Sequence, residues 1–306
     1  MSGKRTEVRP FGPEAIAAAA AFIRAGHPVA VPTETVYGLA ADATNAEAVA
    51  GIYAAKGRPS FNPLIVHVPD LAAARRLGEF DAAALALAKQ YWPGPLTLVV
   101  PLAADSPIAS LVTAGLSSIA LRVPAHPAMR ALLEASGRPL AAPSANASGR
   151  ISPTRAAHVL ASLDGRIPLV IDGGPTAHGL ESTIIAATDG SLRLLRPGPI
   201  VIDASKETRG IEAPGMLESH YAPGKPVRLD AGSARAGEWL IGFGSVAGDD
   251  SLSASGDLVE AAARLFDCLH RADSAAAPRI AVAHVPDEGL GLAINDRLRR
   301  AAAPRD

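Results

Sequence analysis

Short apolar runs rich in valine, isoleucine and leucine recur along this 306-residue chain, and each ends in proline, glycine or polar residues. Runs of this length and composition are typical of buried β-strands. Stretches with helical spacing, among them 13–25, 46–56, 81–92 and 127–136, separate the early runs. Alternating strands and helices indicate an α/β protein. In the later part of this region, before Ile202, the strand patterns follow one another without helices between them. We therefore expect a twisted, mixed sheet.

A stretch rich in proline and glycine at residues 206–226 is typical of a linker. After it, strand and helix patterns alternate again. We therefore predict an α/β domain in residues 1–205 and a second, smaller α/β domain of Rossmann-like type in residues 227–306. A core of about 80 residues is marginal on its own, so we expect the small domain to pack against the first.

The overall charge and the cysteine content exclude several classes of function. With a net charge of -1, the chain carries no general positive field for nucleic acid, so any anion site must be a local cluster. The single cysteine, Cys268, excludes a disulfide framework, and its helical spacing favours a buried position. The sequence shows no membrane-spanning run and no secretory signal, so we expect a cytoplasmic protein without membrane partners.

Common catalytic signatures are absent from the sequence: there is no P-loop, no H-E-x-x-H and no G-x-S-x-G. The stretch "GFGSVAG" at 242–248 is close to a dinucleotide-binding fingerprint, but its last gap is one residue too long. We interpret it as a loop that follows a strand.

Two expected helices carry capping signals at their starts. Thr44 and Glu47 fit a capping box in front of the helix at 46–56. Ser152 fits an N-cap, with Pro153 as the first helical residue. These signals predict where the two helices begin.

Small hydroxyl residues and single cations lie at the ends of the expected strands. They are Thr33, Thr35, Lys56, Arg58, Asn62, Ser118, Arg122, Ser144, Asn146, Ser148, Ser152, Ser182, Thr183 and Arg196. Ligand groups collect at strand ends in α/β sheets, and hydroxyls, turn N–H groups and arginines suit phosphate oxygens. Together with Arg150, the cations in these loops predict a local basic pocket.

Taken singly, each of these residues has a simpler explanation. Thr33 and Thr35 suit a polar turn, Lys56 suits the C-terminal turn of a helix, and His67 suits a hydrogen-bonded buried histidine. Their joint occurrence at strand ends favours one shared site.

Together these stretches resemble the YrdC-like family, specifically its two-domain threonylcarbamoyl-AMP synthases. The matching motifs are "PTETVYGLAADA", "KGRP", "NPLIVHV", "WPGPLT", "ALRVP", "APSAN", "IDGG", "ESTI" and "LRPG". Further on, "GMLESHYAPGKP" and "GLGLAINDRLRRAA" resemble the linker and C-terminal domain of the longer family members. The resemblance implies a YrdC-like catalytic domain and a linker that closes over the active site as a lid.

The resemblance also implies a reaction. L-threonine, bicarbonate or CO2, and ATP would give L-threonylcarbamoyladenylate and pyrophosphate, which makes the chain a nucleotidyltransferase. A downstream transferase complex would use the product to modify tRNA next to the anticodon. Mg²⁺ would accompany ATP, and no dedicated metal ligands are expected.

The resemblance assigns roles to individual residues. The catalytic residues near bicarbonate and the phosphates would be Lys56 and Arg58. Threonine would contact Thr35, His67, Arg122, Ala142 and Ser182, with Arg122 on its carboxylate. ATP would contact Arg58, Asn62, Ser118, Ser144, Ser152, Arg196 and Tyr221, and Tyr221 with His220 would belong to the lid.

Two other functions fit parts of the pattern. A module that binds double-stranded RNA or tRNA would use the same basic concavity, although the net charge favours only weak binding. A carbamoyltransferase or kinase would use the same pocket for another acceptor.

Overall fold

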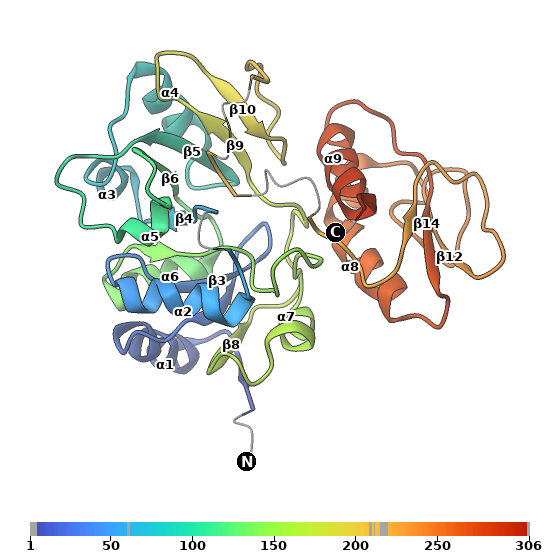
Figure 1. The fold of residues 1–306 in the computed structure, drawn as a ribbon, viewed down its shortest axis with the longest axis horizontal. Helices are drawn as coiled ribbons and strands as arrows, with labels where there is room; N and C mark the ends of the chain where they lie inside the picture. Colours follow the sequence, from blue (N-terminus) through green and yellow to red (C-terminus); the bar gives the residue numbers. More distant parts are fainter. Residues whose placement is uncertain (1–4, 60–61, 208–209, 211, 215–219, 305–306) are drawn as a thin grey trace.

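A computed structural model of the chain describes residues 5–59, 62–207, 210, 212–214 and 220–304, and Figure 1 shows two α/β units. The strands of the larger unit are β1 (Glu7–Pro10), β2 (Val29–Pro32), β3 (Tyr37–Asp42), β4 (Ile65–His67), β5 (Leu96–Pro101), β6 (Ser118–Arg122), β7 (Leu140–Ala141), β8 (Leu169–Asp172), β9 (Thr183–Ala186) and β10 (Arg193–Arg196). They form a ten-stranded sheet in the order β1-β8-β2-β3-β7-β4-β6-β5-β9-β10. Because β4 runs parallel to β6 while β5 runs antiparallel to it, the sheet is mixed, which confirms the predicted fold class.

Helices cover both faces of this sheet. They are α1 (Pro13–Arg24), α2 (Ala46–Lys56), α3 (Leu71–Arg75), α4 (Ala82–Tyr91), α5 (Ser110–Thr113), α6 (Pro127–Ser136) and α7 (Ala156–Leu163). Side chains alternate between the faces of a strand. On β2, Val29 and Val31 therefore pack with α1 and α6, whereas Ala30 belongs to the larger core that includes α2.

The start of α2 differs from the predicted capping box. Asn45, not Thr44, is the N-cap, because its Oδ1 accepts hydrogen bonds from the backbone N of Glu47 (2.9 Å) and of Ala48 (3.2 Å). Thr44 instead donates its hydroxyl to Asp42 Oδ1 at 2.7 Å. The prediction was therefore wrong by one residue, because the extended backbone of Asn45 brings its amide oxygen to the helix end.

The start of α7 also differs from the prediction. This helix begins at Ala156, so Ser152 is not its cap and Pro153 is not its first residue. The Ser152 hydroxyl donates instead to Glu181 Oε1, which lies far along the chain. The buried carboxylate thus takes the hydroxyl that the capping interpretation had assigned to the helix.

The second unit contains β11 (Val227–Arg228), β12 (Glu238–Gly242), β13 (Asp250–Ser251) and β14 (Arg279–Val282), with helices α8 (Leu258–Ser274) and α9 (Gly291–Ala302). Its strands pair in parallel in the order β11-β14-β12-β13.

The chain turns directly after β12, where Phe243 and Val246 pair across the turn, so "GFGSVAG" is a loop as predicted. Cys268 is buried on α8, also as predicted. Within the described chain, no helix is long and apolar enough to cross a bilayer.

Helices α8 and α9 form the side of the small unit that faces the larger one (Figure 1). Leu180 of the larger unit shares a hydrophobic cluster with Phe266 and Leu269 of α8. Gly179 permits this close approach, because a Cβ built there would lie 2.4 Å from the backbone oxygen of Ala263. The small sheet thus rests on the first domain through its helices. The exact domain limits at 205 and 226 stay a prediction.

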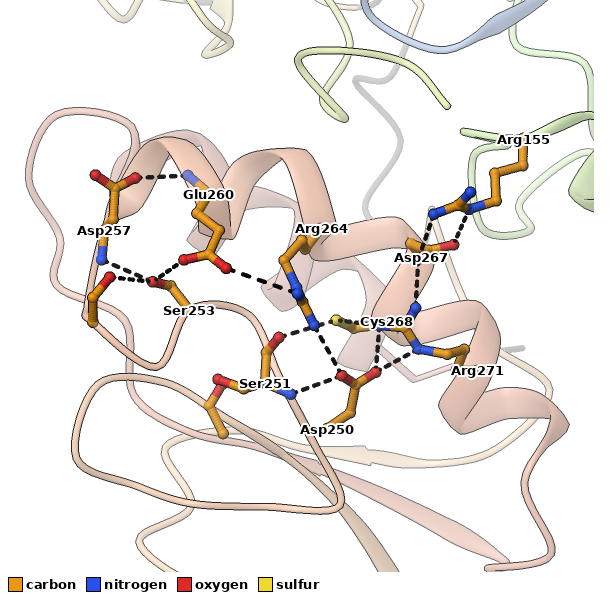
Figure 2. A network of polar contacts seen from close by, with 12 residues as sticks. Arg155, Asp250, Ser251, Ser253, Asp257, Glu260, Arg264, Asp267, Cys268 and Arg271 are labelled. Atoms are coloured by element: carbon orange, nitrogen blue, oxygen red, sulfur yellow. Dashed lines mark hydrogen bonds and ion pairs between the residues drawn. The ribbon is translucent and has the colours of Figure 1, made fainter. Parts of the chain in front are cut away.

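Polar groups tie the two units as well. Arg155, at the start of α7, donates from Nε to Asp267 Oδ1 on α8 at 2.8 Å, and Figure 2 shows Asp267 within a larger network around Asp250. Nearby, the rings of His158 and His270 stack with centroids 3.8 Å apart. These contacts fix α8 against α7.

Candidate active site

His67 and Arg122 lie side by side in the candidate site. The parallel pairing of β4 with β6 sets the two residues at the same register position. Their chain neighbours Val66 and Leu121 point into the main core, so His67 and Arg122 point to the opposite face. There both line a cavity of about 50 Å³.

Arg122 is held by neighbouring groups of the protein. Its Nη2 pairs with Glu34 Oε1 at 2.5 Å, and its Nη1 donates to Thr35 Oγ1 at 2.9 Å. Burial alone would raise the pKa of Glu34, but the charge and hydrogen bond of Arg122 lower that pKa to about 2. The pair is therefore ionised. Its Nε also donates to the backbone O of Gly94 at 3.2 Å. A guanidinium has five N–H donors, so two of them have no partner among the described residues and remain for an anionic ligand.

His67 is a neutral donor or acceptor at physiological pH. Burial, reinforced by the charge of Arg122, lowers the pKa of its imidazole to about 3. Its Nδ1 is buried and has no hydrogen-bond partner among the described residues. A buried polar atom in this state is suited to a ligand or an ordered water.

Arg196 and Ser182 form the opposite wall. Arg196 donates from Nε to the backbone O of Ser182 and from Nη2 to its Oγ, both at 3.1 Å. The Ser182 hydroxyl also shares a 2.7 Å hydrogen bond with Thr97 Oγ1. Burial lowers the pKa of Arg196 below its ordinary value. An arginine side chain keeps its charge in proteins, so this wall is positive.

Arg58 is the third buried arginine on the cavity. It donates from Nη2 to the backbone O of Pro63 at 3.1 Å, and its Nε has no partner among the described residues. Burial lowers its pKa to about 10, so the guanidinium is still charged at neutral pH. Asn62 Oδ1 beside it is buried and likewise unpartnered in the described chain.

Lys56 supports the cavity from behind. The helix α2 ends at Lys56, and Gly57 follows with a φ of 59°, a left-handed conformation that glycine adopts readily. Lys56 Nζ donates to Ser144 O (2.5 Å), Asn146 O (2.6 Å) and Asn146 Oδ1 (3.1 Å). Burial and the charge of Arg58 lower the pKa of this amine. Through these three contacts, Lys56 holds the 144–146 wall in place.

Among the described residues of the predicted linker and lid, Pro214, His220 and Tyr221 line the cavity. Tyr221 has a φ of 61°, which is uncommon for an aromatic residue. Its ring packs 5.6 Å from that of Phe266 on α8, and its buried hydroxyl has no partner in the described chain. Residues 208–209, 211 and 215–219 of the predicted linker lie outside the described residues.

Most of the predicted site residues meet at this cavity. Those that line it are Thr35, Arg58, His67, Arg122, Ala142, Ser144, Ser182, Arg196 and Tyr221. Lys56, Asn62 and Ser152 lie one contact away, bonded to Ser144, Arg58 and Glu181 respectively.

Ser118 and Arg150 lie apart from this group. Ser118 is at the opposite end of β6 from Arg122, about 13 Å away at the usual rise of a strand. Arg150 is exposed and pairs through its backbone with Ala222. The structure therefore brings together three of the predicted cations, Arg58, Arg122 and Arg196, around the cavity itself.

Sequence reasoning missed the acids that hold the cations. Glu34 lies between the two threonines of "PTETVYG", and Glu181 directly precedes Ser182, so both stood next to named residues. A buried arginine needs a counter-charge, and that requirement was the available signal. Arg297, the partner of Glu181, lies 116 positions away and gave no local signal.

The cavity wall is not built as a metal cage. Among the described residues that line it, Glu181 is the one carboxylate, and it is already bonded to Ser152 and Arg297. The described chain contains no group of three or more histidine, cysteine or acidic side chains arranged for a metal.

The fold and the cavity define a two-domain α/β protein with a cavity lined by three buried arginines. The chain belongs to the Sua5/YciO/YrdC family, whose model, described as telomere recombination, matches residues 21–198. A second model, described as threonylcarbamoyl-AMP synthase, C-terminal domain, matches residues 180–303. Together these matches confirm the resemblance to the two-domain members of the family.

Two relatives align with nearly the whole chain, and a third aligns with its first domain. The threonylcarbamoyl-AMP synthase of Bacillus subtilis is 42% identical, over 95% of this chain and 93% of its own length. The crystal structure of Pyrococcus abyssi Sua5 complexed with L-threonine is 37% identical, with a TM-score of 0.87 over 97% of this chain and 96% of that one. Escherichia coli YciO, at 22% identity and a TM-score of 0.58, covers 65% of this chain and 98% of its own and supports the fold of the first domain alone.

Proposed function

We propose that this chain is a threonylcarbamoyl-AMP synthase. It would combine L-threonine, bicarbonate or CO2, and ATP into L-threonylcarbamoyladenylate, with release of pyrophosphate. This reaction makes it an enzyme of the nucleotidyltransferase class. The observation that carries the proposal is the convergence of Arg58, Arg122 and Arg196 on one cavity together with the hydroxyls of Thr35 and Ser182. The Bacillus subtilis relative, named threonylcarbamoyl-AMP synthase, supports the same activity.

L-threonine fits the part of the cavity around β4 and β6. Arg122 has spare donors for a carboxylate, and an arginine binds that group in a planar, bidentate manner. The neutral His67 and the hydroxyls of Thr35 and Ser182 offer hydrogen bonds to the polar groups of the amino acid. Because His67 carries no charge, it does not repel the ammonium of threonine.

ATP fits the side of the cavity near Arg58 and Arg196. In the reaction, the ammonium of threonine first loses a proton to solvent. The resulting amine forms a bond to the carbon of bicarbonate, and water leaves. A carbamate oxygen then attacks the α-phosphorus of ATP, and the bond to the β-phosphate oxygen breaks. Phosphoryl transfer of this kind depends on positioning and charge stabilisation. Buried guanidinium groups supply both, and Lys56 keeps the 144–146 wall in position.

Mg²⁺ fits this proposal as the companion of the triphosphate. It would neutralise charge on the departing pyrophosphate. Since Glu181 is engaged by Arg297 and Ser152, the protein would contact the ion mainly through the nucleotide and water.

Substrates need more room than the cavity has. Its volume is about 50 Å³, whereas small-molecule sites usually hold about 300–1,000 Å³. We infer that His220 and Tyr221, which the family resemblance places in a lid, move for the substrates to enter. Their return would exclude water from the carbamate and the adenylate, which both hydrolyse.

A reactive acyl adenylate must be consumed soon after it forms. We therefore propose that a tRNA threonylcarbamoyl transferase complex takes up the product, in the cytoplasm, where ATP and tRNA are available. Direct RNA binding by this chain is not needed for that handover.

The test is a product assay with defined omissions. The protein is incubated with ATP, Mg²⁺, ¹³C-labelled bicarbonate and L-threonine, and the product mass and pyrophosphate release are measured. We expect a labelled threonylcarbamoyladenylate only when all substrates are present. Arg58→Ala should abolish it, whereas Arg138→Ala, at an exposed site outside the cavity, should not. A different acceptor or pyrophosphate release independent of threonine would refute the proposal.

A further inference from the structure

Arg297 of the C-terminal domain reaches the wall of the cavity without lining it. The residue lies on α9 and its side chain is fully buried. Its Nε donates to Glu181 Oε2 at 3.0 Å, and its Nη1 donates to the backbone O of Pro197 at 2.7 Å. Its guanidinium carbon also lies 5.4 Å from the centre of the Tyr221 ring. One side chain of the small domain thus touches an acid and an aromatic ring that both line the cavity.

Glu181 is the group whose charge needs this partner. Its side chain is only 7% exposed, and its other oxygen accepts the Ser152 hydroxyl. A buried carboxylate is costly to leave without a counter-charge. The surrounding charges on α9 are Asp296, which also bonds Arg297 Nη1 at 3.0 Å, and Arg300, which pairs with Asp296 at 3.1 Å. Of the residues that bond Glu181 directly, Arg297 is the cation.

The balance of charge at the cavity depends on this pair. Arg58, Arg122 and Arg196 make the lining positive, and Glu181 is the one carboxylate among the described lining residues. A triphosphate approaching an uncompensated Glu181 would meet like charge, which weakens binding strongly at a buried site. With Arg297 in contact, the carboxylate is offset from the side away from the ligand.

The Tyr221 ring gives Arg297 a second connection to the site. A guanidinium close to an aromatic face is attracted to it. The ring also lies near Phe266 of α8 and, with centroids 4.1 Å apart, near the ring of His220. Tyr221 holds its left-handed backbone conformation between Arg297 and Phe266 of the small domain. The C-terminal domain therefore contacts both Tyr221 of the proposed lid and Glu181 of the cavity wall.

We propose that Arg297 is a positioning residue of the active site, through which the C-terminal domain offsets the charge of Glu181 and so sets the affinity for the nucleotide. The inference rests on the proposed function, because it takes ATP as the ligand. It differs from a purely structural tie in one respect. If Arg297 only tied the domains together, it would still be needed when residue 181 is neutral. If it compensates the charge of Glu181, it would no longer be needed in that case.

The experiment compares five variants of the full chain: Arg297→Met, Arg297→Lys, Glu181→Gln, the double variant E181Q/R297M, and Arg299→Met as the matched control. Arg299 lies on the same helix with a side chain 59% exposed, and it pairs with Asp287. ATP dissociation constants are measured by titration calorimetry, kcat and KM by pyrophosphate release, and Tm by calorimetry.

Arg297→Met should raise the ATP dissociation constant about tenfold or more, with a smaller change in kcat. Arg297→Lys should restore most of the affinity because it keeps the charge. The double variant should bind ATP within about threefold of the unmodified protein, because the stranded charge is gone. Arg299→Met should bind normally. If Arg297→Met is too unstable to assay, the double variant decides the question, because ATP binding weakened by more than about threefold in that variant would overturn the inference.

Three results would overturn the inference. They are normal ATP affinity in Arg297→Met, failure of Glu181→Gln to restore that variant, and a loss in Glu181→Gln alone as large as that in Arg297→Met. The proposed function fails separately, when the unmodified protein binds ATP but makes no threonylcarbamoyladenylate.

Discussion

Two arginine–carboxylate pairs tie the domains together, and they differ in their surroundings. Arg297 pairs with Glu181 at 3.0 Å, with side chains 0% and 7% exposed. Arg155 pairs with Asp267 at 2.8 Å, but the Arg155 side chain is 47% exposed, and Asp267 also binds Arg271 (Figure 2). The bond lengths are alike, so water and alternative partners decide the energetic effect. Loss of Arg155 leaves Asp267 with another cation, whereas loss of Arg297 leaves a buried acid beside the cavity.

Arg122 and Glu34 form a further buried pair, and breaking this pair is expected to have the largest effect on activity and stability. Arg122→Ala should remove the proposed carboxylate contact and abolish threonine-dependent pyrophosphate release. Because Glu34 would then be buried without its cation, the free energy of unfolding should also fall by about 3–5 kcal/mol. Urea unfolding and the pyrophosphate assay measure the two effects.

The control for Arg122→Ala is Arg138→Ala, which breaks a looser, exposed contact to Asp42 at 3.5 Å. That variant should lose less than about 1 kcal/mol and keep full turnover. If Arg122→Ala were as stable as this control, the claim that burial makes the loss of an ion-pair partner costly would be wrong.

His158 and His270 stack at the contact between α7 and α8, beside the Arg155–Asp267 pair. This stack predicts that the stability of the fold falls in acid. Burial, and then the charge of His270, lower the pKa of His158 from 6.5 to about 3, with Asp267 acting in the opposite direction and Arg155 and Arg271 reinforcing the decrease. The unfolded chain therefore takes up the proton first, and stability falls as the pH drops from 6.5 toward 3. At pH 5 the loss from His158 is about 2 kcal/mol.

His158→Asn should flatten this part of the stability profile, measured by urea unfolding at pH 7, 6 and 5. The control is His284→Asn, because the His284 side chain is 66% exposed in the small domain and should leave the profile unchanged. Equal acid sensitivity with and without His158 would show that the stack does not govern the contact.

The smallest effect is expected at the exposed pair. Arg155→Ala should lower the free energy of unfolding by less than about 1 kcal/mol, since a partly solvated ion pair contributes little and is screened by salt. The difference from the unmodified protein should shrink further in 0.5 M NaCl. A loss comparable to that of Arg122→Ala would erase the distinction between the two kinds of pair.

Local signals predicted the regular elements well. The helix predicted at 46–56 and the one predicted at 127–136 coincide with α2 and α6, because each combines helical spacing with a glycine at its end. Some strands were missed. β1 was not predicted, since its pairing partner β8 lies some 160 positions further along, and β3 was taken as a polar turn although it pairs with β2 and β7.

The same distinction applies to the site. Thr35, Arg122 and Ser182 could be named from hydroxyl and cationic residues at strand ends, together with the family resemblance. The role of Ser152 as a helix cap was wrong, because Glu181 competes for its hydroxyl across 29 residues. Arg297 could not be found at all, since its helix shows only that one face is buried and not which acid meets it.

By itself the sequence determined the α/β class, most helix limits and the set of residues able to bind anions, because these depend on side-chain type and on spacing over a few residues. The tertiary structure alone decided which cations share the cavity, which acids offset them and how the small domain reaches the site. Those outcomes depend on strand register and domain packing, where residues far apart in the chain exclude water from one another and so become strongly coupled.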